Sequence, residues 1–131
     1  MEEALIKRVL PHSIEAEQSV VGAMLMDKEA IMTASEIISG EDFYQTTYGV
    51  VFGAIVELYN EGKPVDLITL QDRLREKDVP EEIQSLEFVR ELLTSVSTSA
   101  NVKYYADIVA EKSMLRKLIR LTEGIANTCY L

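Results

Sequence analysis

The sequence predicts an all-α fold: a six-helix, orthogonal bundle-like globule that ends in one long helix. Apolar residues recur at helical spacing in six segments, and no segment shows the strict alternation of a half-buried strand. The 131 residues are 47% apolar and 27% charged, which gives enough apolar surface for one core and enough charge for a hydrated exterior. Disordered and multi-domain chains are therefore disfavoured.

The first two helices are predicted from their caps. Ser13 is suited to cap a helix over residues 14–26, and Glu15 lies in its first turn, where the helix dipole favours negative charge. Asp27 can cap a second helix, whose apolar stripe ends just before Gly40.

The middle of the chain predicts three more helices. The clearest apolar stripe covers residues 46–61, where apolar side chains return every third or fourth position until Gly62 ends the helix. Asp66 can cap a short fourth helix, which ends in a run of charged residues. An acidic loop over residues 79–84 follows, and Ser85 opens a fifth helix that a stretch rich in Ser and Thr ends.

The sixth helix begins near Asn101 and keeps its apolar phase for about 25 residues. A helix of that length spans roughly 38 Å and extends beyond a small globule. Its stripe through Leu115, Leu118 and Ile125 exceeds what five shorter helices can cover, so we expect these residues at a self-association interface. Since the chain stops at Leu131 without a polar tail, we also expect it to be a piece of a longer protein.

The net charge of −9 repels phosphate and argues against a domain that grips DNA. The charge is uneven, because the last 31 residues carry five basic and three acidic side chains. An alternative function is therefore a nucleic-acid-contacting helical domain that uses the basic side of the last helix. That side would carry Lys103, Lys112, Arg116, Lys117 and Arg120.

A self-contained enzyme is disfavoured, because no catalytic, cofactor or metal constellation is present. Gly62-Lys63 is followed by a proline, and Glu57 stands where a phosphate-binding loop needs its first glycine. One histidine and one cysteine cannot make a zinc site. His12 is interpreted as a surface or cap residue. The carboxylate pairs are interpreted as helix starts or solvated charge; they are Glu15 with Glu17, Glu41 with Asp42, and Glu81 with Glu82.

The lone Cys129 forms no internal disulfide, which is typical of a reducing compartment. The sequence shows no signal peptide, and no apolar run approaches the roughly 20 residues of a membrane span. A cytoplasmic protein is therefore expected.

Several motifs resemble the amino-terminal domain of bacterial replicative DNA helicases, the DnaB family. The resemblance covers about residues 10–129 and keeps the order and spacing of the family. The motifs are LPHSIEAEQSVVGAML (10–25), EDFY (41–44), GKPVDLITL (62–70) and SANVKYYA (99–106), the last followed by EKSMLRKLI (111–119).

The resemblance implies a hexameric ring that unwinds DNA at the replication fork with ATP and magnesium, bound in a carboxy-terminal RecA-like domain that this chain lacks. It also implies a collar of six amino-terminal domains, arranged as a trimer of dimers through paired helical hairpins. We accordingly expect a flexible arm over residues 1–10, a helical head over 11–100 and the first helix of a dimerisation hairpin over 101–131.

The family's collar also receives the helicase-binding domain of primase, and a helicase loader is a further implied partner. DNA would be encircled by the full ring, with weak or no binding to this domain. Position by position, the resemblance assigns primase contact to Glu15, Phe88, Ile119 and Ile125. For Phe88 and the two isoleucines, a place in the core or in the hairpin seam is an equally good interpretation.

Overall fold

The computed structural model describes residues 9–131, and this part of the chain holds α-helices and short 3-10 helices but no strand. The predicted all-α fold is confirmed. The residues 1–8 of the predicted arm lie outside the described part. In chain order the elements are α2 (Ile14–Met26), α3 (Lys28–Ile37), η1 (Gly40–Asp42), α4 (Thr46–Asn60), α5 (Leu67–Arg75), η2 (Glu81–Gln84), α6 (Leu86–Thr94) and α7 (Val102–Tyr130).

The helix caps follow the sequence. Ser13 accepts the Ala16 N–H at 3.2 Å, and the Asp66 carboxylate accepts the N–H groups of Ile68 and Thr69 at 2.9 Å each. The predicted acidic loop over 79–84 is partly wrong, because η2 forms there and buries Ile83. One apolar side chain among acidic neighbours is enough to pull that turn onto the core.

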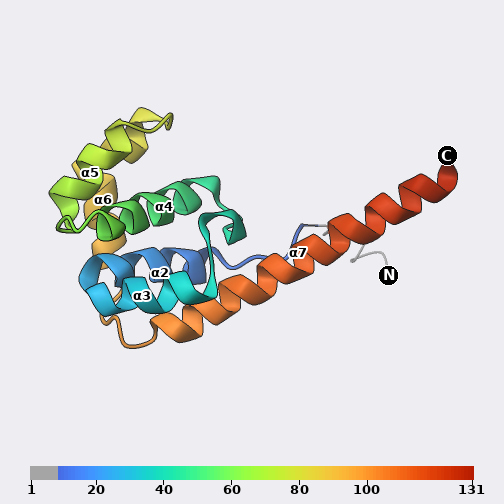
Figure 1. Cartoon of the computed structure of the whole chain (residues 1–131), viewed down its shortest axis with the longest axis horizontal. Helices are drawn as coiled ribbons and strands as arrows, with labels where there is room; N and C mark the ends of the chain where they lie inside the picture. Colours follow the sequence, from blue (N-terminus) through green and yellow to red (C-terminus); the bar gives the residue numbers. More distant parts are fainter. Residues whose placement is uncertain (1–8) are drawn as a thin grey trace.

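Helices α2 to α6 form a head that packs on the first half of α7, whose second half projects away from it (Figure 1). Helix α2 is central, since it contacts α3, α4, α6 and α7. Its side chains Val20, Val21 and Met24 are almost completely buried. The other helices add large core side chains to the same cluster: Ile31, Ile55, Leu70, Leu74, Leu92 and Val109. No helix within residues 9–131 is long and apolar enough to cross a membrane.

Helices α2 and α6 approach each other closely at Gly22. A Cβ atom at Gly22 would lie 2.5 Å from the carbonyl oxygen of Leu92 and 2.9 Å from the hydroxyl of Ser95. A backbone oxygen cannot rotate away, so any side chain at this position would push the two helices apart. Gly53 in α4 is the opposite case, because its Cβ would meet nothing within 4 Å.

We therefore expect Gly22→Ala to lower the free energy of unfolding by about 1–3 kcal/mol. Gly53→Ala is the matched control and should raise the free energy of unfolding by up to about 1 kcal/mol, because alanine favours the helix more than glycine does. Urea denaturation of the two variants measures both effects. Equal stability of the two variants would contradict the close contact between α2 and α6.

Candidate interaction surface

A buried carboxylate holds the segment that joins α3 to α4. Glu17 on α2 is 1% exposed, and its two oxygens accept the N–H groups of Tyr44 at 2.9 Å and Gln45 at 3.0 Å. These N–H groups lie at the start of α4, where the helix dipole favours a negative group. Glu17 lies in the first turn of α2, as the helix-start interpretation expects, but it is not solvated, because it pairs with backbone more than 25 positions away.

The same segment is bound from the other side by α7. The buried hydroxyl of Ser113 donates to Oδ1 of Asp42 at 2.7 Å, and Lys117 reaches the same oxygen at 3.2 Å. The backbone N–H of Ser39 donates to Oδ2 of Asp42 at 2.8 Å. Burial alone would raise the pKa of Asp42, but these three hydrogen bonds outweigh burial and hold its pKa below the usual 3.8.

Arg116 completes the attachment. The residue is 4% exposed, and its guanidinium donates from Nη1 to the carbonyl of Pro11 at 2.8 Å and from Nη2 to the carbonyl of Asp42 at 2.6 Å. It also lies 5.7 Å from the centroid of the Tyr44 ring, on which His12 stacks with a centroid distance of 4.0 Å. We call this group the clasp; it consists of Glu17, Asp42, Tyr44, Ser113 and Arg116.

Because Arg116 belongs to the clasp, it is not part of an exposed basic side of the last helix. A buried guanidinium bonded to two carbonyls is not available to phosphate. Lys103 is paired with Asp107 on the same helix, and Lys117 is paired with Asp42. His12, directly before the N-cap Ser13, is half-buried and stacks on Tyr44.

Beyond the clasp, α7 presents an apolar face to the solvent. Leu118, Leu121 and Ile125 are 50%, 60% and 57% exposed. At 100° per residue these three side chains fall within an arc of about 60°, and that arc lies about 180° from the side on which Val109 and Arg116 meet the head. We call this surface the distal face. Leu115 lies at its edge and is less exposed.

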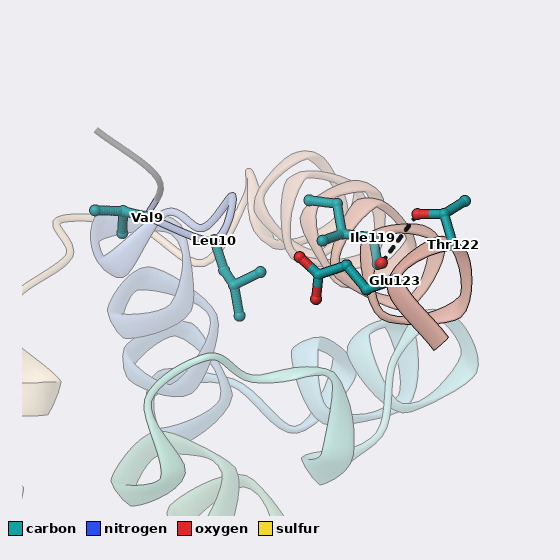
Figure 2. Close-up of a pocket in the computed structure, with 5 residues that line it drawn as sticks. All are labelled: Val9, Leu10, Ile119, Thr122 and Glu123. Carbon is teal, nitrogen blue, oxygen red and sulfur yellow. Dashed lines mark hydrogen bonds between the residues drawn. The ribbon is translucent and has the colours of Figure 1, made fainter. Parts of the chain in front are cut away.

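A groove of about 370 Å³ lies beside the distal face. Figure 2 shows Val9 and Leu10 along one wall and Ile119, Thr122 and Glu123 along the other, with the Glu123 carboxylate turned into the gap between the walls. The Thr122 hydroxyl donates to the Ile119 carbonyl at 3.0 Å, so it is already occupied. The groove therefore offers apolar walls and one acidic side chain.

The four residues expected at the primase contact lie on three helices, α2, α6 and α7. Ile119 is half-buried in the groove, and Ile125 lies on the distal face. Glu15 is exposed in the first turn of α2. Phe88 is half-buried against the core from α6, which lies at the end of the head away from the projecting half of α7 (Figure 1).

Sequence reasoning missed several residues of this surface. Leu121 lies three residues after Leu118 and four before Ile125, which is the helical spacing of the stripe, so its signal was present in the sequence. No local sequence pattern indicates that Val9 and Leu10 line the groove. Their place there depends on how the start of the chain packs beside α7. Within residues 9–131, no three His, Cys, Asp or Glu side chains gather closely enough to hold a metal ion.

Comparison with known proteins identifies the family. Residues 9–111 match the family model described as DnaB-like helicase N terminal domain. The replicative DNA helicase DnaB of Geobacillus stearothermophilus is 45% identical over 130 residues, which are 99% of this chain and 29% of that protein. The replicative DNA helicase DnaC of Bacillus subtilis is 40% identical over the same shares. The chain thus spans less than a third of the length of these relatives.

Solved structures agree with the fold. The crystal structure of the N-terminal domain of DnaB helicase from Mycobacterium tuberculosis superposes with a TM-score of 0.88 at 36% identity, covering 94% of this chain and 89% of that one. The N-terminal domain of DnaB helicase from Helicobacter pylori, described together with its interactions with primase, gives a TM-score of 0.76 at 19% identity, covering 89% of this chain and 91% of that one. The second likeness supports the fold alone.

The lowered pKa of Asp42 gives the clasp a pH dependence. A carboxyl whose pKa is lowered by folding contributes stability that is present above its unfolded pKa and is lost as the pH falls through its folded pKa. Asp42→Asn should therefore cost roughly 1–2 kcal/mol of unfolding free energy at neutral pH, and progressively less as the pH falls below 3.8, the usual pKa of the group. Denaturant unfolding between about pH 7 and pH 2.5 measures the difference. The control variant is Asp72→Asn, because Asp72 is exposed. If the difference in unfolding free energy between the parent chain and Asp42→Asn stayed constant across this pH range, the role of Asp42 would be contradicted.

Proposed function

Because the chain belongs to the family of DnaB-like helicase N-terminal domains, we propose that it is the non-catalytic collar domain of a replicative DNA helicase. In this proposal the domain assembles the hexameric ring through dimer contacts and docks primase at the replication fork. ATP and magnesium would act in a motor domain outside this chain. The observation that carries the proposal is the exposed apolar distal face of α7.

The geometry of the distal face supports self-association. Since the face lies about 180° from the head-facing side of α7, the head of the same chain cannot cover it. Met114, Leu118, Leu121 and Ile125 alternate spacings of four and three residues, which is the pattern of helices that pack side by side in a coiled coil. We propose that a helical hairpin of a second copy covers the distal face. In each copy, residues 11–100 form the head and residues 101–131 form the first helix of the hairpin.

Primase docking is supported by Ile119, in the groove beside the distal face, and by Ile125, on the distal face. A recruitment contact combines an exposed apolar anchor with charges at its rim. Ile119 and Ile125 are the anchors that we propose, and Glu15 supplies rim charge. Phe88 is the fourth proposed contact, at a separate place on the head. A helicase loader is a further proposed partner of the collar.

DNA in this proposal passes through the assembled ring without a strong grip by this domain. The net charge of −9 supports that view, as does the burial of Arg116. The alternative of a nucleic-acid contact along the last helix retains only the exposed Arg120, the half-buried Lys112 and the two paired lysines.

Self-association should depend on Leu118. We expect Leu118→Asp to raise the dimer dissociation constant at least about tenfold, because a carboxylate would be buried among apolar side chains. Sedimentation measures the association, and circular dichroism checks that helicity is retained. Asn127→Asp is the matched control, since residue 127 lies on the opposite side of α7 and is exposed. Loss of the fold in Leu118→Asp, or equal loss of association in both variants, would contradict the proposed interface.

Primase binding should depend on Ile125 and Glu15 in different ways. In the full-length hexamer, Ile125→Ala should weaken binding of the helicase-binding domain of primase by roughly 1–2 kcal/mol if the side chain is an interface anchor. Glu15→Ala should mainly slow association and reduce its dependence on salt. Calorimetry and surface plasmon resonance measure the two effects. Unchanged binding by both variants would assign these residues to the scaffold.

A further inference from the structure

The contacts between α7 and the head change from apolar to polar along the helix. The side chains that α7 buries are Val102, Ala106, Val109, Ser113 and Arg116, which follow one another at alternating spacings of four and three residues. The first three are apolar and the last two are polar. Beyond Arg116 the helix has no fully buried residue in the described chain, and Ile119 alone is half-buried. The last firm attachment before the projecting half is therefore made by hydrogen bonds.

Hydrogen bonds fix direction in a way that apolar contacts do not. The guanidinium of Arg116 is planar, and its two outer nitrogens bond carbonyls from two separate segments, at Pro11 and Asp42. Apolar side chains can slide past each other at small cost, whereas a planar group held at both ends resists tilting. The partners are themselves fixed, because Glu17 holds the segment that carries Asp42 through the N–H groups of Tyr44 and Gln45.

A small change in the direction of α7 at Arg116 produces a large displacement at the end of the helix. From Arg116 to Tyr130 the helix runs about 21 Å at ~1.5 Å per residue, so a tilt of about 10° would move its end by about 4 Å. That displacement is nearly half of the ~9 Å between the axes of packed helices. An interface built on the distal face therefore requires a fixed direction for this half of the helix.

We infer that Arg116 is a positioning residue: it sets the direction in which the distal half of α7 leaves the head. Arg116 is buried against the head, so it acts on Leu118, Leu121 and Ile125 by orienting the helix that carries them. The inference that Arg116 sets the direction of α7 rests only on contacts within this chain. Its consequence for assembly rests on the proposed function.

The test measures the direction of α7 without relying on assembly. Cys129 is the single cysteine of the chain and is exposed near the end of α7, so it accepts a nitroxide spin label. A second label is placed on the head by Glu87→Cys, at an exposed position of α6. Pulsed electron spin resonance then gives the distribution of distances between the two labels. An excess of unlabelled chain confines the measurement to distances within one molecule.

We expect one narrow distance peak for the parent chain and for Arg120→Ala, which removes an exposed arginine about one turn further on. Arg116→Ala should broaden the peak about twofold, as expected when a helix loses its directional hydrogen bonds. If circular dichroism shows that Arg116→Ala does not fold, Arg116→Lys is measured instead. That variant keeps the charge but loses the planar fork, and it should also broaden the peak.

An unchanged narrow peak in folded Arg116→Ala or Arg116→Lys would overturn the inference, and so would a broad peak in the parent chain. Sedimentation of the unlabelled variants separates this inference from the proposed function. Absence of self-association in the parent chain would contradict the assembly role, while the distance distribution would still decide whether Arg116 sets the direction of α7.

Discussion

The segment over residues 39–45 is held from two sides by buried charged groups, and the arrangement of the whole chain depends on this double attachment. From α2, the carboxylate of Glu17 binds the backbone N–H groups of Tyr44 and Gln45. From α7, Arg116 binds the backbone carbonyl of Asp42. A charge is stable out of water only when its hydrogen-bonding capacity is met, and within the described chain no buried side-chain nitrogen or oxygen lacks a partner. The two groups therefore act as specific attachments.

Three of the motifs that resemble the family meet at this segment. His12 and Glu17 belong to the first motif, Asp42 and Tyr44 to the second, and Arg116 to the last. These residues are far apart in sequence and come into contact only in the fold. Their shared role is to join the head to the long helix, while the side chains that we propose for self-association lie outside the clasp, on the distal face.

Local patterns predicted the helices well, because caps and apolar stripes are properties of neighbouring residues. Ser13, Asp66 and the stripe of α4 are examples. The clasp was not predicted, since Arg116 bonds a carbonyl 105 positions earlier and Glu17 bonds backbone 27 and 28 positions later. A glutamate in a first turn has the same sequence signature whether it is buried or solvated. The groove beside Ile119 was missed for the same reason, because one wall comes from residues 9 and 10.

The clasp makes the head and the first half of α7 one cooperative unit, from which the second half projects. Amide hydrogen exchange along α7 measures this cooperativity residue by residue. We expect the amides from Ala106 to Arg116 to exchange as slowly as those of the core helix α2, and amides beyond Arg120 to exchange much faster in the monomer. Uniform exchange along the whole of α7, or fast exchange that begins before Ser113, would contradict it.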